Sequence, residues 1–144
     1  MTRDETQQFF DRRISSWRQR DVDALGQLHT SDCVLESPIA GTVTGRAAIE
    51  NVYGAFFTSF PDVTIDNPDL WVDGDRVVQS VTFAGTNTGG FMGMAPTGKH
   101  FSFAAVLICV MRDGQIAHER RIYDFTGFLL EIGVLKAKPV DHVR

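Results

Sequence analysis

The chain has 144 residues, enough for one compact domain with a buried core and too few for two. It carries 14 basic and 18 acidic side chains, a net charge of −4, and 43% of its residues are hydrophobic. These values exclude disordered and fibrous proteins, and without a cluster of Lys and Arg we expect neither nucleic acid nor an anionic membrane as a partner.

The N-terminal part of the chain predicts mainly helix. Apolar side chains recur at three- and four-residue steps over residues 5–18 and again over 44–60, as on the buried stripe of a helix. Asp21 or Asp23 would cap a shorter helix between them. Residues 33–36 form a brief predicted strand, which a proline and a glycine end.

The rest of the chain predicts four longer strands and a terminal helix. Turns that contain Asp-Gly separate the outer pairs of strands, and a glycine-rich loop, residues 89–98, separates the middle pair. This loop could act as a mobile flap over a binding site. The predicted strands are residues 63–72, 76–88, 99–111 and 115–124, and the predicted helix is 125–132 with Gly133 at its C-terminal cap.

Helices that precede an antiparallel meander predict an α+β fold with segregated layers. A strongly curved sheet with helices across one face would enclose a cone-shaped space, and a ligand would bind there. No stretch is apolar and long enough to span a membrane, and the N-terminus lacks a signal peptide, so we expect a cytoplasmic protein. Cys33 and Cys109 lie in apolar runs, so we expect buried free thiols and no metal site.

The order of these elements resembles the nuclear transport factor 2-like fold over nearly the whole chain. Two segments are more specific: Gly85–Phe101 with its glycines and Ala95-Pro96-Thr97-Gly98-Lys99, and Asp113–Gly133 with Asp124-Phe125. Both resemble the SnoaL-like polyketide cyclases. The resemblance implies one SnoaL-like domain over residues 1–144, with a core of about 5–135. It also implies three N-terminal helices over a curved antiparallel or mixed sheet, a cone-shaped pocket and a short C-terminal helix.

The same resemblance implies an intramolecular aldol ring closure on an aromatic polyketide, without a cofactor or metal, and with Asp124 as the catalytic residue. The sequence departs from related patterns at two positions. A histidine that some cyclases carry on the preceding strand would fall near Leu107, which is apolar. Ketosteroid isomerases of this fold carry an aspartate base where this chain has Ser37, which argues against an isomerase of that kind.

Strand alternation from Ile116 places Ile122 and Asp124 on one face, which we expect to point inward. Burial there would raise the pKa of Asp124, as a general acid/base requires. The alternative is that Asp124 caps the terminal helix and is ionised. His118 and Arg120 share this face and could bind substrate carbonyls or contact Glu36 or Asp69. The opposite face, with Ala117, Glu119, Arg121 and Tyr123, would pair with a second copy in a homodimer or higher oligomer.

Aromatic side chains are candidates for the walls of the pocket, although aromatic residues at helical or strand spacing more often serve as ordinary core. Tyr53 would offer a phenol, and Asn87 would offer an amide donor unless it is simply a turn residue. The flat walls would come from Trp17, Phe57, Phe83, Phe91 and Phe103.

We therefore expect an enzyme that performs cofactor-free acid/base chemistry on a hydrophobic substrate that contains carbonyl groups, such as a polyketide. The reaction would be an aldol-type cyclisation or a related lyase or isomerase reaction. Two alternatives stay open. One is a small-molecule binding module of the same fold that performs no chemistry, and the other is a dehydratase or an epoxide hydrolase.

Overall fold

The computed structural model describes residues 1–139, and their fold is α+β, as the sequence predicts. Residues 140–144 of the expected domain lie outside the described residues. In chain order the elements are α1 (Arg3–Gln19), α2 (Val22–Gln27), β1 (His29–Ser37), β2 (Gly41–Thr44), α3 (Arg46–Ser59), β3 (Thr64–Asp73), β4 (Arg76–Thr86), β5 (His100–Arg112), β6 (Gln115–Tyr123) and α4 (Phe125–Glu131).

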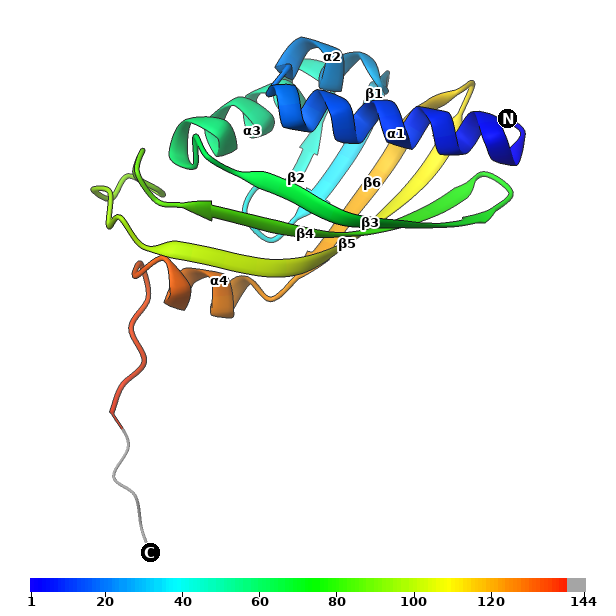
Figure 1. The fold of residues 1–144 in the computed structure, drawn as a ribbon. Helices are drawn as coiled ribbons and strands as arrows, with labels where there is room; N and C mark the ends of the chain where they lie inside the picture. The colour runs from blue at the N-terminus through cyan, green and yellow to red at the C-terminus, as the bar shows by residue number, and fades with distance from the viewer. Residues whose placement is uncertain (140–144) are drawn as a thin grey trace, which may run out of the picture.

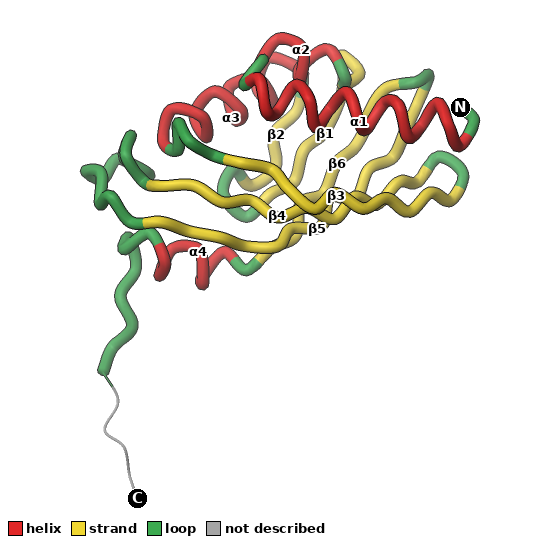
Figure 2. The backbone as a smooth tube through the Cα atoms, in the orientation of Figure 1, coloured by secondary structure: helices red, strands yellow, loops and turns green. Residues whose placement is uncertain are grey.

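The strands form one mixed sheet in the order β2-β1-β6-β5-β4-β3, in which β1 runs parallel to β6 and the other pairs are antiparallel. Helices α1, α2 and α3 lie across one face of this sheet (Figure 1), and the strands curve beneath them (Figure 2). Helix α4 packs beside β5, where the Phe128 ring lies 4.9 Å from that of Phe101. The helices and the curved sheet together enclose the main apolar core.

The predicted helices form because their apolar stripes face the sheet, and side chains cap the starts of α1 and α2. The Thr2 hydroxyl accepts a hydrogen bond from the Glu5 amide at the start of α1, and the Asp21 carboxyl caps α2. Gly133 adopts a positive φ of 76° directly after Ile132, the C-cap residue of α4, which is the position that the sequence predicts for a capping glycine. In the part of the chain that the structure describes, no helix has the length and apolar character needed to cross a membrane.

The first strand is longer than the brief strand predicted, and a second strand was missed. β1 spans nine residues and pairs antiparallel with β2 after a short turn. The sequence of β2 gives little signal, since Val43 is its single apolar side chain and the strand lies at the exposed edge of the sheet. Pairing with β1, rather than burial of a face, therefore defines this strand.

A bulge in β6 changes which side chains face the helices. Val110 of β5 pairs with His118, and the next residue, Met111, pairs with Ile116, so Ala117 is an extra residue in β6. One extra residue moves every later side chain to the opposite face of the sheet. The expected inward face of His118, Arg120 and Ile122 is therefore wrong. Instead Glu119 and Arg121 point inward, with the Glu119 side chain fully buried and that of Arg121 only 10% exposed, whereas Arg120 and Ile122 are exposed.

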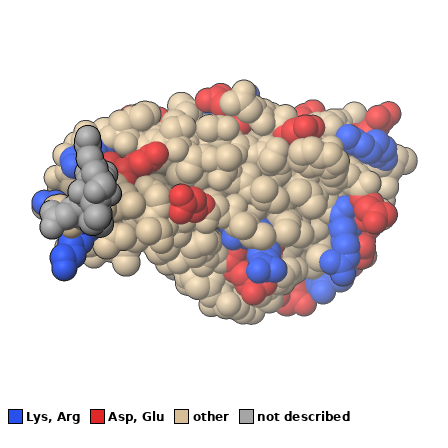
Figure 3. Space-filling model, turned by 90° about the horizontal axis from the view of Figure 1, so that it is seen from below, with Lys and Arg blue, Asp and Glu red and all other residues tan. Residues whose placement is uncertain are grey.

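This reversal also removes the surface expected to bind a second copy, because Glu119 and Arg121 belong to the interior. The outer face of the sheet instead carries Val106, Ile108 and Ile122, and Ile122 is 44% exposed. Figure 3 shows the molecule from below, where most of the visible surface is uncharged. Cys33 and Cys109 are buried free thiols, as the sequence predicts.

Candidate functional site

A cavity of about 530 Å³ lies between α3 and the inner face of the sheet. Apolar and aromatic side chains form most of its wall, as in typical small-molecule sites. Helix α3 supplies one side, and strands β4, β5 and β6 supply the other. The lining residues are Trp17, Ser37, Ile39, Ala40, Val43, Ala48, Asn51, Val52, Tyr53, Ala55, Phe56, Ser59, Phe83, Phe91, Met92, Phe103, Arg121 and Tyr123.

Arg121 is the single charged residue among the described residues that line this cavity, and none of them is Asp, Glu or His. The Arg121 side chain is 10% exposed, and its Cζ lies 5.0 Å from the centre of the Tyr53 ring, within the range of a cation–π contact. Its Nε donates a hydrogen bond to Oε2 of Glu119 at 2.5 Å. The polar end of the cavity is therefore a guanidinium that a buried carboxylate holds in place.

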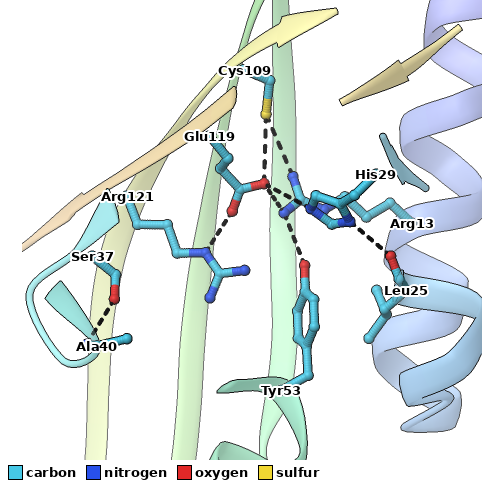
Figure 4. Close-up of polar contacts among 9 residues, drawn as sticks. All are labelled: Arg13, Leu25, His29, Ser37, Ala40, Tyr53, Cys109, Glu119 and Arg121. Atoms are coloured by element: carbon cyan, nitrogen blue, oxygen red, sulfur yellow. Dashed lines mark hydrogen bonds and ion pairs between the residues drawn. The ribbon is translucent and has the colours of Figure 1, made fainter. Parts of the chain in front are cut away.

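Glu119 also accepts a hydrogen bond from Arg13, which projects from α1 and is fully buried (Figure 4). Arg13 uses the same terminal nitrogen, Nη2, to donate to the Tyr53 hydroxyl at 3.2 Å, and its Nη1 lies 3.7 Å from Sγ of Cys109. Neither Arg13 nor Glu119 lines the cavity. These two residues and Arg121 form a buried cluster in which two guanidinium groups share one carboxylate.

The charges in this cluster stabilise one another. Burial alone would raise the pKa of the Glu119 carboxyl, but the positive charges of Arg13 and Arg121 override this effect and hold that pKa well below its usual range. The Glu119 charge in turn raises the pKa of both Arg13 and Arg121, although burial alone would lower them. Glu119 is consequently ionised at neutral pH, and it is a weak base.

His29 lies beside the cluster and is fully buried. Its Nδ1 donates to the Leu25 carbonyl oxygen at 2.9 Å, and its Nε2 lies 4.0 Å from Oε1 of Glu119. Burial lowers the pKa of His29 to about 4, despite the nearby Glu119 charge, so the imidazole is neutral at neutral pH. Because His29 does not line the cavity, it is a structural neighbour of the cluster and has no direct path to a ligand.

Five of the aromatic residues that the sequence predicts for the pocket line the cavity: Trp17, Tyr53, Phe83, Phe91 and Phe103. Phe57 lies behind this wall, where its ring centre is 5.2 Å from that of Trp17. Tyr123, which the sequence analysis assigned to the outer face, is also a lining residue. Burial raises the pKa of the Tyr123 phenol to about 12, so this hydroxyl stays protonated.

Asn87 does not reach the cavity. Its Nδ2 donates to Thr97 Oγ1 at 3.1 Å, and its Oδ1 accepts from the Gly90 amide at 3.2 Å. Asn87 therefore holds the glycine-rich loop, which is the turn role that the sequence left open. Gly89 fixes the same loop against the end of α3, because a Cβ at this position would lie 1.9 Å from the Thr58 carbonyl oxygen.

The buried position expected for Asp124 is wrong. The side chain is exposed, and its Oδ1 accepts a hydrogen bond from the Gly127 amide at 2.9 Å. Strand β6 ends one residue earlier, at Tyr123, so Asp124 leaves the sheet and caps α4. The desolvation on which a role as general acid/base would depend is therefore missing at this carboxyl.

His118 and Arg120 lie outside the cavity, on the other face of β6. His118 Nε2 contacts Glu36 Oε2 at 2.7 Å, and both side chains are at least 40% exposed. Arg120 borders a shallower hollow of about 370 Å³, which shares Ser37, Arg121 and Tyr123 with the cavity. The expected contact of His118 with Glu36 thus forms, but at the surface.

The sequence reasoning missed Arg13, Glu119 and Arg121 as parts of the site. Arg13 did carry a signal, because a charged residue on the buried stripe of a helix needs a buried partner. The partner, Glu119, was assigned to the wrong face of its strand. Among residues 1–139, no group of three or more His, Cys, Asp or Glu side chains is close enough to hold a metal ion.

The sequence matches a known protein family, and the fold is similar to several solved structures. A family model for SnoaL-like polyketide cyclases matches residues 7–132. TsrD from Streptomyces laurentii is 22% identical, with a TM-score of 0.82 over 94% of this chain and 99% of that chain. AclR from Streptomyces galilaeus, a candidate hydroxylase, is also 22% identical, with a TM-score of 0.82 over 96% of this chain and 87% of that one. IdmH from Streptomyces antibioticus, a candidate polyketide cyclase, is 26% identical, with a TM-score of 0.74 over 88% of this chain and 97% of that one. No curated protein matches the sequence.

Proposed function

The chain belongs to the SnoaL-like polyketide cyclase family, and from this premise we propose that it binds a hydrophobic, carbonyl-containing molecule of the polyketide type and promotes its ring closure. Arg121 would polarise a carbonyl oxygen of this ligand. The observation that carries the proposal is the position of Arg121, whose charged side chain lines an otherwise uncharged cavity and is held there by Glu119.

The cavity suits such a ligand in size and character. Its volume of about 530 Å³ lies within the range of small-molecule sites. Trp17, Phe83 and Phe103 line it with aromatic rings that can pack against a fused-ring skeleton. The carbonyl oxygens of the ligand would need donors, and Arg121 and the protonated Tyr123 phenol supply them.

The proposed chemistry is stabilisation of an enolate, followed by an aldol step. A carbon next to a carbonyl group loses its proton to water, and the carbonyl oxygen gains negative charge beside Arg121. The enolate carbon then attacks a second carbonyl carbon, which forms the new ring bond and leaves an alkoxide. That alkoxide takes a proton from Tyr123, which water restores. Donors held in place before the charge develops can account for a rate gain of roughly 10²–10³ each.

A second candidate function is a binding module that performs no chemistry. The specific observation in its favour is the composition of the cavity wall, where the described residues include no Asp, Glu or His to accept a proton. In this case Arg121 would only orient the ligand.

Hydrogen exchange on an aromatic ketone separates the two functions. The probe is 2-tetralone in D₂O, and NMR follows both its binding and the loss of its C1 protons. Enolate stabilisation predicts that the wild-type protein accelerates the exchange. Arg121→Met should lose this acceleration. The matched control Arg120→Met should keep it, because the Arg120 side chain is exposed. Binding with exchange at the uncatalysed rate would support the binding module instead.

Blocking the cavity gives a test that does not disturb the buried charges. Val52 lines the cavity from α3. It takes no part in the hydrogen bonds that join Arg13, Glu119 and Arg121. A Val52→Trp substitution would fill the cavity and should abolish both binding and exchange. If 2-tetralone does not bind the wild-type protein at all, the proposed function is wrong.

A further inference from the structure

The buried cluster behind the cavity carries an unbalanced positive charge. Arg13 and Arg121 are both cationic, and Glu119 is their shared counterion. Each carboxylate oxygen is already engaged, Oε1 with Arg13 and Oε2 with Arg121. Two positive charges and one negative charge leave one positive charge in excess. The excess faces the cavity, because Arg121 lines it and Arg13 does not.

The other ionisable groups beside the cluster do not remove this excess. The His29 imidazole is neutral, because burial lowers its pKa to about 4. Burial raises the pKa of the Cys109 thiol to about 12, so it carries no negative charge. No Asp or Glu occurs among the described residues that line the cavity. An uncompensated charge at such a depth is unfavourable, and an anion bound next to it would relieve the cost.

Two donors at the cavity wall lack partners within the described part of the chain. Nη2 of Arg121 and Nε1 of Trp17 are both buried, and neither has a hydrogen bond. The two side chains contact the same ring, since Tyr53 lies 5.0 Å from the Arg121 Cζ and 5.3 Å from the centre of the Trp17 ring. Buried polar groups in proteins nearly always have a hydrogen-bond partner, so these two donors indicate a place for ligand oxygen atoms.

The orientation of Arg121 determines what kind of oxygen group fits. Its Nε faces Glu119, and its two terminal nitrogens lie on the side of the guanidinium away from that carboxylate (Figure 4). The free end of a guanidinium presents two parallel N–H donors, which match the two oxygens of a carboxylate. A lone carbonyl oxygen would use one of these donors and leave the excess charge in place.

We propose that the cavity takes its ligand as a carboxylate: an aromatic, fused-ring acid whose carboxylate pairs end-on with Arg121 and whose rings pack beside Trp17 and Tyr53. This inference rests on the proposed function to the extent that a hydrophobic small molecule enters the cavity. It adds that the ligand also carries a carboxylate and that Arg121 selects the ligand through this group, so the Tyr123 phenol is the donor left for the carbonyl oxygen in ring closure.

Two probes of equal shape test the charge. They are 2-naphthoate and 2-naphthamide, titrated by calorimetry at neutral pH into the full chain. We expect the carboxylate to bind about tenfold more tightly than the amide, because its hydrogen bonds with Arg121 are charge-assisted. Arg121→Met should remove this preference, and Arg120→Met, the exposed neighbour, should keep it.

Each other outcome is informative. If both probes bind wild-type protein equally, the inference of an anionic ligand is wrong and the proposed function stands. If neither probe binds but 2-tetralone does, the inference is wrong and the proposed function stands; if 2-tetralone does not bind either, both are wrong. If Arg121→Met does not fold, Val52→Trp, which fills the cavity, is the variant that decides. Naphthoate that still binds to Val52→Trp must occupy another site, which would overturn the inference. Loss of binding of both probes would support it.

Discussion

Arg121 and Glu119 lie two residues apart on β6 and contact each other through a hydrogen bond of 2.5 Å from Nε to Oε2. Side chains at this spacing point to the same face of a strand, so the pair is a local product of the β6 backbone. It fixes the direction of the guanidinium and makes the carboxylate a counterion, which leaves Glu119 unsuited to accept a proton from a ligand.

Neutralising this counterion should destabilise the protein strongly. Glu119→Gln leaves Arg13 and Arg121 buried without a negative charge, so we expect the free energy of unfolding to fall by about 3–5 kcal/mol. Urea denaturation followed by circular dichroism measures the change. The matched control is Glu36→Gln, which breaks the surface contact with His118 and should cost at most about 1 kcal/mol. Equal losses in the two variants would contradict the role assigned to the cluster.

Mild acid should weaken the fold through His29. Its pKa is about 4 in the folded protein, against an ordinary value of 6.5, so the unfolded chain binds more protons between these two pH values. The free energy of unfolding should therefore decrease as the pH falls through this window, by up to about 1.4 kcal/mol per pH unit. In His29→Gln, whose amide can still donate to the Leu25 carbonyl, denaturation midpoints measured across this window should depend less on pH. An unchanged pH dependence in this variant would show that other groups cause it.

Loss of the helix cap at Asp124 should affect stability and spare the cavity. Asp124→Ala removes the hydrogen bond to the Gly127 amide and should cost about 1 kcal/mol, whereas Asp124→Asn retains an oxygen acceptor and should cost less. Thermal unfolding measures the cost, and exchange on 2-tetralone should proceed as in the wild-type protein. A large loss of exchange in a folded Asp124→Asn protein would instead return this carboxyl to the active site.

The homodimer expected from the sequence stays a prediction, but the surface expected to bind the second copy is now the outer face of the sheet with Val106, Ile108 and Ile122. Light scattering after size-exclusion chromatography should give twice the mass of the chain if a second copy covers the outer face of the sheet. Ile122→Lys places a charge on that face and should then yield a monomer, because Ile122 is 44% exposed and apolar. Thr88→Lys, at an exposed position in the loop after β4, is the control for added charge. A wild-type monomer at micromolar concentration would exclude the dimer.

Local patterns were sufficient to predict much of the fold. The helical stripes around Trp17 and Tyr53 and the turn before Arg76 depend on residues close together in the chain, and each lies where the pattern predicts. The aromatic wall of the cavity followed from the same periodicity. These features could be derived because the spacing of apolar side chains alone specifies which face is buried.

The charged part of the site could not be derived in this way. Whether Glu119 or His118 points inward depends on Ala117, and the sequence of β6 does not reveal that Ala117 has no partner on β5. Arg13 has its partners 40 and 106 residues away, in Tyr53 and Glu119. Only the completed sheet brings these groups together, so the cluster is a property of the tertiary structure.

The bulge at Ala117 determines which polar side chains of β6 face the interior of the fold. Deleting this one residue would remove the bulge and keep the present faces, because Ile116 and His118 already pair with Met111 and Val110, which are consecutive residues of β5. If Ala117 instead paired as a regular residue, the register would shift by one, and His118 and Arg120 would point to the interior while Glu119 and Arg121 would point to solvent. A one-residue shift of register in β6 is therefore a route by which otherwise similar cavities could exchange one set of polar side chains for another without altering a single side chain.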